Sequence, residues 1–381
     1  MLIKTILCKT GEILMGLPGF KETINQHLQN EITPSQLYID NFPYYTEKNG
    51  WATLGNSGWD DWVSGFWPGI SWLAVSADKK WLGKAREKTS QITARLNNNF
   101  NIGFRYQYSW VAGYEITRDP AMKKEALDAA QRLQKCFDPR AGIICHRPNK
   151  TQLIAATDSL MNLPLLFWAH QQSGDSAPWE FILRSSLNRS RELFLRSDGS
   201  IRHLVKLEAS TGKVISSQSP QGKENGCWSR GLAWAVAGFI LGGLKFNDDT
   251  YLETADRLIS YHCKNTDGLI PAYDYCIDLK EKPQLTDTSA AAIIAASLIL
   301  LGIKRNDRSY FSLGKKITEK LFTDYLRDKD QPGLLGGSCF HYPGRAGINS
   351  ATVWGDFYAL EALYLLEKEE TPLYYNWLKS A

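Results

Sequence analysis

The chain has 381 residues, of which 43% are hydrophobic and 12% aromatic, so it can bury a large core and is not an intrinsically disordered protein. Its formal charge of +4 is small, and no run of Lys and Arg alternates with aromatic residues, so we expect no nucleic-acid partner. No segment approaches the roughly 18 consecutive apolar residues of a membrane span, so we expect no membrane partner either.

Seven cysteines are scattered along the chain, and no two of them form a C-x-x-C pair. An odd number at irregular spacing predicts neither a disulfide framework nor a zinc site. Reduced, scattered cysteines are typical of cytoplasmic proteins, and this is the location that we expect. The sequence also has no metal-binding motif, phosphate loop or dinucleotide fingerprint, so we expect no metal and no cofactor.

The first 16 residues, MLIKTILCKTGEILMG, are apolar with charged interruptions. Lys4, Lys9 and Glu12 break the run, so the continuous apolar segment of a secretory signal does not form. The remaining apolar residues recur at helical spacing and predict an amphipathic helix over residues 2–14.

Further along the chain, one pattern recurs five times. An apolar run ends, a polar turn with an aspartate follows, and an amphipathic segment begins. The aspartates of these turns are Asp78, Asp119, Asp175, Asp248 and Asp307. Aspartate is a preferred N-cap because its carboxylate accepts a hydrogen bond from an unpaired backbone N–H, so each one predicts the start of a helix. After Asp119, Pro120 suits the first helical turn, and the apolar residues of 122–133 form one stripe.

A different kind of segment precedes each of these turns, and a sixth lies near the C-terminus. These segments are apolar on most faces and begin with polar or aromatic residues. They read GFWPGISWLAVSA, GFRYQYSWVAGYEIT, DSLMNLPLLFWAHQQ, WSRGLAWAVAGFILGGL, DTSAAAIIAASLILLGI and WGDFYALEALYLLEK. A helix that is apolar all round belongs in an interior. Six inner helices, five of them followed by an outer helix, predict an all-α double ring, a six-hairpin α/α barrel. We expect the N-terminal helix to supply the sixth outer helix.

Two details qualify this pattern. Residues 200–217, SIRHLVKLEASTGKVISS, predict a β-hairpin that turns at Thr211 and Gly212 and decorates the longest connection. Pro164, inside the third inner segment, either kinks that helix or marks a later start. No linker rich in Pro, Gly or Ser divides the chain, so we expect a single domain over residues 1–381.

In a double ring of this kind, the N-termini of the inner helices open at one end, and polar residues there converge on one pocket. The candidates are Asp60, Asp61, Trp62, Asn101, Asp158, His203, Gln221, Trp228, Arg230, Asp287, Trp354 and Asp356. Helix N-termini attract negative charge. Aromatic faces stack on the C–H surfaces of sugars while a polar rim binds hydroxyls, so a pocket of this composition favours a carbohydrate.

Several candidates also have a purely structural interpretation. Asp158 and Asp287 suit helix N-caps, and any one tryptophan is more often part of a core. His203 by itself is expected to be a surface histidine. Arg230 beside Trp228 either packs as a cation–π pair or binds a ligand carboxylate.

Six phrases of the sequence resemble one known family and occur in the order of that family. They are GFWPGISWLA, GFRY, DSLMNLPLLFWA, CWSRGLAWA, DTSAAAI and WGDFYALEALYLLE, and they span roughly residues 55–368. The sequence resembles the unsaturated glucuronyl hydrolases of glycoside hydrolase family 88. A sister family, the unsaturated rhamnogalacturonyl hydrolases, shares the fold but matches these phrases less well.

The resemblance implies a six-hairpin α/α barrel, in agreement with the double ring predicted from the repeats. It implies an oligosaccharide substrate, left by a polysaccharide lyase, that ends in a 4,5-unsaturated uronic acid. The implied reaction is hydration of the vinyl ether double bond: an acid protonates C4, water adds to C5, the resulting hemiketal opens, and the glycosidic bond breaks. One carboxyl group then serves as acid and base, unlike the paired carboxylates of most glycosidases.

Site residues are carried over from the family position by position. The resemblance makes Asp158 the general acid and base, which must hold a proton near the working pH. The positions that hold the unsaturated sugar or its neighbour match His203, Gln221, Trp228, Arg230 and Trp234, and Trp62 matches a stacking position.

The chain departs from the family at its second catalytic position. The family has a second aspartate, normally after a histidine, directly before IGF or VGF, whereas this chain has Phe100 and Asn101 there. Asparagine can hydrogen-bond but carries no charge, so no neighbouring anion favours the protonated form of Asp158 and we expect reduced hydration activity. Three explanations stay open: an asparagine introduced to trap a substrate complex, a natural variant with a shifted substrate, or a catalytically impaired carbohydrate-binding barrel.

Overall fold

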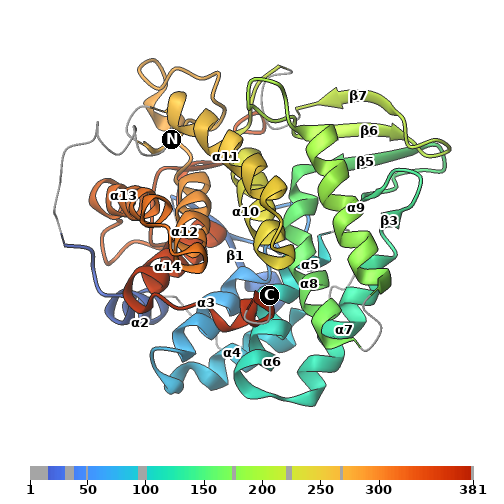
Figure 1. The fold of residues 1–381 in the computed structure, drawn as a ribbon. Coiled ribbons are helices and arrows are strands. Elements are labelled where there is room, and N and C mark those ends of the chain that lie inside the picture. The colour runs from blue at the N-terminus through green and yellow to red at the C-terminus, as the bar shows by residue number, and fades with distance from the viewer. Residues whose placement is uncertain are drawn as a thin grey trace.

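A computed structural model describes residues 16–30, 38–48, 50–92, 101–173, 177–219, 225–266 and 269–378. Six helical segments form an inner ring (Figure 1), and most of their residues are buried. In chain order they are α3 (Phe66–Val75), α5 (Ile102–Tyr106) continued by η4 (Gln107–Val111) and α6 (Ala112–Thr117), η5 (Thr157–Asn162) continued by α8 (Leu163–Gln172), α10 (Ser229–Phe246), α12 (Thr288–Arg305) and α14 (Val353–Lys368). The predicted inner segments are therefore confirmed as helical.

An outer helix follows each of the first five inner segments. These outer helices are α4 (Leu82–Ser90) with the short η2 (Lys79–Trp81), α7 (Pro120–Gln134), α9 (Ala177–Phe194), α11 (Asp249–Lys264) and α13 (Arg308–Asp324). The predicted N-caps are confirmed at Asp78, Asp119, Asp248 and Asp307, because each carboxylate accepts a hydrogen bond from the backbone N–H two residues later. Asp175 lies outside the described residues.

The ring closes between its last and first inner helices. α14 packs against both α12 and α3, and α2 (Phe20–Asn30) packs on the outside of α14 and α3. The backbone N–H of Phe20 donates to Glu367 of α14 at 2.9 Å, and the Phe20 ring meets Tyr364 edge-on. The sixth outer helix is thus α2, while the helix predicted over residues 2–14 lies outside the described residues.

One helix in the described part of the chain, α12, is long and apolar enough to cross a membrane by length and composition alone. Of its apolar window, 83% is buried inside the protein. Its neighbours are the inner helices α10 and α14 and the outer helix α13. The apolar character of α12 therefore belongs to the core of the double ring.

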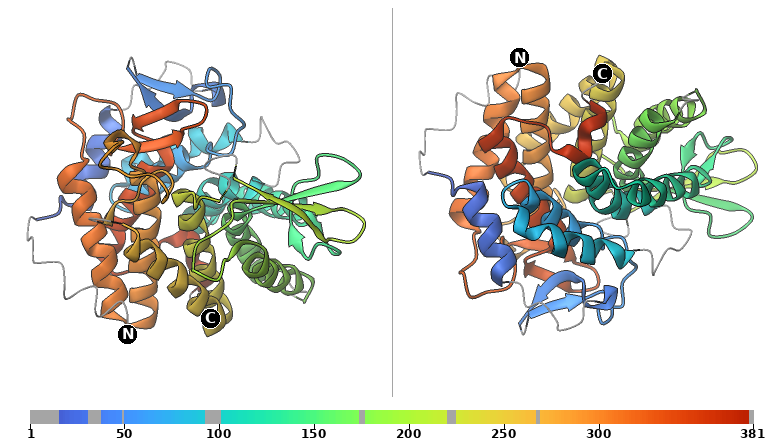
Figure 2. Two further views of the ribbon diagram at one scale, coloured as in Figure 1. Left: turned by 90° about the horizontal axis from the view of Figure 1, so that it is seen from above. Right: turned by 90° about the horizontal axis from the view of Figure 1, so that it is seen from below.

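Short strands decorate the ring, and those within residues 137–218, drawn in green, project to one side of it (Figure 2). β5 (Gln152–Ala156), β6 (Leu204–Glu208) and β7 (Val214–Gln218) form an antiparallel sheet in that order. The predicted hairpin is confirmed, and Gly212 has the positive φ of 69° that its turn requires. Two-stranded ribbons are formed by β1 (Pro43–Glu47) with β2 (Gly50–Thr53), β3 (Phe137–Asp138) with β4 (Ile143–Ile144), and β8 (Ser338–His341) with β9 (Ala346–Ser350).

The chain end packs against the C-terminal halves of the inner helices. There η8 (Leu373–Leu378) places the carbonyl of Tyr374 2.6 Å from the Gln107 amide nitrogen that donates to it. The Tyr374 hydroxyl donates to the buried Glu361 at 2.8 Å, and Asn376 donates to Glu115. This end of the ring is therefore covered by η8. Two further single turns are η1 (Ile39–Asn41) and η7 (Pro283–Leu285).

Candidate active site

Asp158 lies at the helix-start end of the ring, in the 3₁₀ turn η5 that follows strand β5. Its carboxylate is not an N-cap, because α8 begins later, at Leu163, with Pro164 in its first turn. The capping interpretation of Asp158 is therefore wrong, and Pro164 marks the later start rather than a kink. The side chain of Asp158 keeps 22% exposure, and it accepts a hydrogen bond from the Thr157 hydroxyl at 3.4 Å.

Strand pairing brings His203 to Asp158. The register of β5 against β6 pairs Ala156 with Leu204, and the backbone N–H of Thr157 donates to the carbonyl of His203 at 3.1 Å. As a result, Nε2 of His203 lies 3.3 Å from a carboxylate oxygen of Asp158. The side chain of His203 is 7% exposed, so the expectation of a surface histidine is wrong.

Asn101 precedes α5 and is joined to the Asp158 turn by a third residue, Asn162. The amide nitrogen of Asn162 donates to the side-chain oxygen of Asn101 at 3.3 Å and to the backbone carbonyl of Asp158 at 3.1 Å. Gly103 permits this contact, because a Cβ at that position would lie 2.3 Å from the Cα of Asn162. The glycine of the IGF phrase thus lets the two predicted catalytic positions share one end of the ring.

The orientation of the Asn162 amide follows from its backbone partners. Its oxygen accepts from the backbone N–H of Phe104 at 3.2 Å, and its nitrogen donates to a backbone carbonyl, so neither end can be exchanged. The atom of Asn101 that faces Asn162 must then be an acceptor. An aspartate at position 101 could accept the same hydrogen bond, so Asn and Asp there differ only in the second terminal atom of the side chain.

A stack of side chains forms the wall beside Asp158. The ring of His203 lies 4.4 Å from that of Trp228, and the guanidinium of Arg230 lies 4.7 Å from the Trp228 ring and 5.3 Å from that of Trp354. Trp228 is the residue before α10, and its backbone pairs with Asp274. Arg230 is therefore a cation–π partner of Trp228, as one of its two interpretations predicted.

The guanidinium of Arg230 is engaged within the protein. It is 1% exposed and pairs with Asp287 at 2.6 Å. It also donates to the backbone carbonyls of Cys339 at 3.0 Å and Phe340 at 2.6 Å. Arg230 therefore joins α10 to the start of α12 and to β8. The binding of a ligand carboxylate by Arg230 stays a prediction.

The predicted tryptophans meet at the same end of the ring. Trp62 is half-buried, and its ring lies 4.9 Å from that of Trp354 and 6.4 Å from that of Trp234. Trp234 and Trp354 are fully buried, in keeping with their core interpretation, and Trp228 is 3% exposed. Trp62 is therefore the predicted tryptophan with the largest surface left to touch a ligand. Gln221 lies outside the described residues.

Three other acidic candidates have structural partners. Burial raises the pKa of Asp61, Asp287 and Asp356, although a cation or hydrogen bond opposes the rise in each case. Asp61 pairs with Arg105 at 3.0 Å. Asp356 accepts the backbone N–H groups of Leu334 and Leu335 at 2.9 and 3.1 Å. These carboxylates hold the ends of helices and loops together, whereas Asp158 is the candidate that combines partial exposure with a histidine and an aromatic wall.

Sequence reasoning did not single out Thr157 or Asn162 as site residues. Both contact the catalytic candidates, Thr157 through its hydroxyl and Asn162 through its amide. The signal was present in the phrase TDSLMN, since a residue four positions after Asp158 returns to the same side of a helical turn.

Comparison with known proteins identifies the family. The family described as Glycosyl Hydrolase Family 88 matches residues 70–307. The chain belongs to glycosyl hydrolase family 88. The resemblance noted in the sequence is thereby confirmed, and this family-88 protein is a glycoside hydrolase with the α/α-barrel fold predicted from its repeats.

Relatives of known name cover most of this family-88 hydrolase. It is 30% identical over 360 residues to the unsaturated glucuronyl hydrolase of Bacillus sp. (strain GL1), covering 88% of this chain and 94% of the relative. It is 26% identical to the unsaturated chondroitin disaccharide hydrolase of Streptococcus pneumoniae, covering 95% of this chain and 96% of the relative.

Solved structures agree with the fold. The crystal structure of the Bacillus sp. GL1 unsaturated glucuronyl hydrolase superposes with a TM-score of 0.81 at 27% identity, over 92% of this chain and 95% of that one. The enzyme from Streptococcus agalactiae superposes with a TM-score of 0.84 at 22% identity, over 97% of this chain and 96% of that one, which supports the fold alone.

Proposed function

We propose that this family-88 hydrolase releases 4,5-unsaturated uronic acid from oligosaccharides generated by polysaccharide lyases. The observation that carries the proposal is the place of Asp158, a partly exposed carboxylate 3.3 Å from His203 at the open end of a tryptophan-lined ring. The names of the relatives support the same substrate class, since they are unsaturated glucuronyl and chondroitin disaccharide hydrolases. The single domain over residues 1–381 and the cytoplasmic location stay predictions.

In the proposed reaction, Asp158 carries out both proton transfers. Its carboxylic acid protonates C4 of the unsaturated ring, and the resulting carboxylate then takes a proton from the water that adds to C5. The hemiketal formed at C5 opens the ring, and the hemiacetal left at C1 breaks down to an aldehyde and the released alcohol. One carboxyl group suffices, so the neutral Asn101 does not prevent catalysis, as it would where two carboxylates are required.

The remaining site residues have proposed roles that fit their places. His203 and Thr157 hold the carboxylate of Asp158, and Trp62 stacks on a sugar ring. Arg230 positions Trp228 by packing against its face, and a ligand carboxylate has to compete with the partners that Arg230 already has. Gln221 is proposed to bind the sugar on the strength of the family resemblance.

The proposal is tested by following the ultraviolet absorbance of the ring double bond with an unsaturated chondroitin disaccharide. We expect the absorbance to fall with the wild-type chain, and Asp158→Asn to abolish the fall. Asp128→Asn is the matched control, because Asp128 makes an exposed ion pair with Lys124 on α7. If the wild-type chain binds the disaccharide without loss of absorbance, the protein is the catalytically impaired carbohydrate binder instead.

A second assay separates the two hydrolase families. We expect cleavage of hexosamine-linked unsaturated uronates, because relatives are chondroitin disaccharide hydrolases by name. Preferential cleavage of rhamnose-linked substrates would assign the chain to the rhamnogalacturonyl type.

A further inference from the structure

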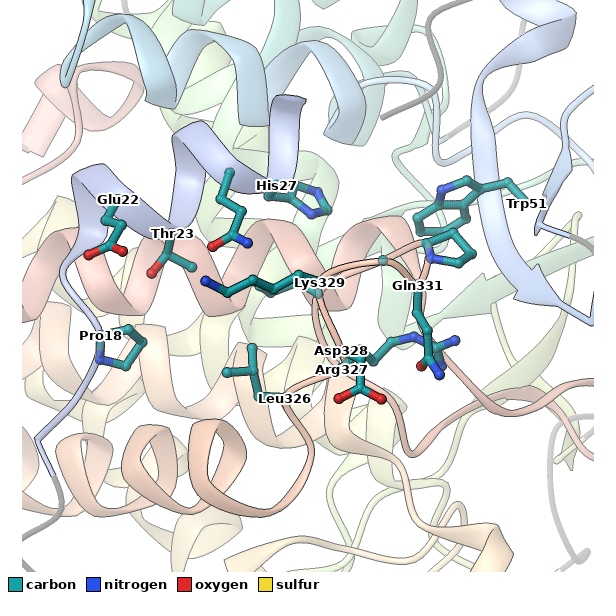
Figure 3. Close-up of a pocket in the computed structure, with 14 residues that line it drawn as sticks. Pro18, Glu22, Thr23, His27, Trp51, Leu326, Arg327, Asp328, Lys329 and Gln331 are labelled. Carbon is teal, nitrogen blue, oxygen red and sulfur yellow. The ribbon is translucent and has the colours of Figure 1, made fainter. Parts of the chain in front are cut away.

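A cavity lies outside the ring, between α2, the segment 326–334 that follows α13, and strand β2 (Figure 3). Its volume is about 210 Å³. We call it the α2 pocket, and the lining residues used below are Glu22, Gln26, Trp51, Arg327, Asp328 and Gln331. None of the predicted site residues lines it, so it is separate from the site around Asp158.

The α2 pocket contains a cation that influences the buried Asp356 through its charge and not through an ion pair. The guanidinium of Arg327 is half-buried, and it makes no ion pair or side-chain hydrogen bond with any residue of the described ranges. Its Nε is enclosed and unpaired there. A partly desolvated guanidinium gains most from a planar anion, a carboxylate or a sulfate, which it can bind through two parallel hydrogen bonds.

The two carboxylates of the α2 pocket do not take this role. Glu22 and Asp328 are both exposed, and we call them the rim carboxylates, whereas Arg327 is half-buried. Lys329, the other cation of the lining, is exposed like the rim carboxylates. Neither carboxylate forms an ion pair with Arg327. An anionic group that enters the pocket therefore meets Arg327, while the rim carboxylates remain available to accept hydrogen bonds from hydroxyls.

The other lining residues favour a sugar as the carrier of this anion. Trp51 offers an aromatic ring that is only half-buried, and Gln26 and Gln331 add side-chain amides, each of which both donates and accepts. The volume of 210 Å³ is below the usual range of about 300–1,000 Å³ for drug-sized ligands, so the pocket suits a single ring.

The wall of the α2 pocket is built into the fold. Gly333 has a φ of 83°, and a Cβ there would lie 2.2 Å from that of Ala351, so the segment is pressed against the chain just before α14. Leu334 and the following residue donate their backbone N–H groups to Asp356 of α14. The pocket wall is thereby fixed before a ligand arrives, which lowers the entropic cost of binding.

We propose that the α2 pocket is a second, non-catalytic binding site for a single sugar that carries one anionic group. Arg327 pairs with that group, Trp51 covers one face of the ring, and the amides and rim carboxylates bind its hydroxyls. The proposal stands on these residues alone and does not depend on the reaction assigned to Asp158.

The test is calorimetric titration of the full chain with glucuronate, glucose 6-sulfate, glucose and inorganic sulfate. We expect the two anionic sugars to bind, and the tighter of them identifies a carboxylate or a sulfate ester as the natural group. Arg327→Gln should weaken their binding by about tenfold or more, and Arg327→Lys by less, because lysine keeps the charge but not the paired geometry. Arg308→Gln on α13 is the matched control and should change nothing.

Hydrolysis of an unsaturated disaccharide should be the same for Arg327→Gln as for wild type, which shows that the variant is folded. Binding of the anionic sugars that is unchanged in Arg327→Gln would overturn the proposal, as would glucose binding as tightly as glucuronate. Inorganic sulfate binding as tightly as the anionic sugars would show a simple anion site and overturn the assignment of a sugar. A chain that binds sugar here but fails to hydrolyse the disaccharide would refute the proposed function and leave this site standing.

Discussion

Replacing Arg230 by methionine decides between its structural and ligand-binding interpretations. Methionine fills a similar volume but removes the charge and all the hydrogen bonds. The change leaves the carboxylate of Asp287, which is fully buried, without its cation at 2.6 Å. It also removes the donor from the buried carbonyls of Cys339 and Phe340. Removing one partner of a buried ion pair costs about 3–5 kcal/mol, and this is the expected loss in the free energy of unfolding.

The loss can be measured by urea unfolding followed by circular dichroism. Arg308→Met is the matched control, because Arg308 makes an exposed pair with Glu369 at 3.4 Å and should contribute less than about 1 kcal/mol. The double variant Arg230→Met with Asp287→Leu should recover most of the stability, since no unpaired charge then remains in the core. The loss should shrink at low pH, because burial already raises the pKa of Asp287 and protonation removes its charge.

The reasoning is refuted if the free energy of unfolding of Arg230→Met lies within about 1 kcal/mol of that of wild type while the KM for the unsaturated disaccharide rises. That result would mean that the guanidinium exchanges its internal partners for a ligand carboxylate. If stability is lost while the KM of the folded fraction is unchanged, the role of Arg230 is structural: it holds Trp228 and the start of α12 in place.

Three further predictions concern other parts of the fold. Asn101→Asp keeps an acceptor for Asn162 and adds a negative charge, so the absorbance assay should show at least about tenfold faster hydration. A slower rate would contradict the assignment of position 101 as the second catalytic position. Gly103→Ala should lower the free energy of unfolding in urea by about 1–3 kcal/mol or more, because the added Cβ would strike the backbone of Asn162. Gly83→Ala should raise it by about 0.5–1 kcal/mol, because nothing lies within 4 Å of the added Cβ. Equal changes in the two variants would be inconsistent with a close contact between Gly103 and Asn162. Burial raises the pKa of Glu361 from 4.5 to about 8, so the folded chain keeps a proton that the unfolded chain loses. The free energy of unfolding should therefore fall as pH rises from about 4.5 to about 8, and Glu361→Gln should abolish the part of that fall that Glu361 causes. If the difference in stability between wild type and Glu361→Gln does not change with pH, this prediction is wrong.

Local patterns in the sequence predicted the architecture. Asp119 followed by Pro120 marks the start of α7 because capping depends on residues next to each other in the chain. The apolar inner segments follow from composition alone, as α12 shows with 15 of its residues buried without a break from Thr288 to Gly302. Such features require no knowledge of distant contacts, and the double ring could therefore be assembled from them.

The details of the site depend on contacts between distant residues. His203 is buried against Asp158 because β5 pairs with β6 in one register, and neither the pairing nor its register can be read from the hairpin sequence. The carboxylates of Asp287 and Asp356 look equivalent to that of Asp158 in the sequence. Only the fold shows that they are held by a cation or by backbone N–H groups, whereas Asp158 stays partly exposed.

The hydrogen bond from Phe20 to Glu367 joins residues 347 positions apart. At about 5–20 residues per second, a ribosome makes the two partners roughly 17–70 s apart. For most of that delay α3 has been made but lacks its neighbour α14, and apolar surface is open to other nascent chains. A nascent chain on a ribosome stalled before residue 353 should accordingly bind a holdase chaperone. This binding should cease once α14 has emerged and closes the ring of inner helices.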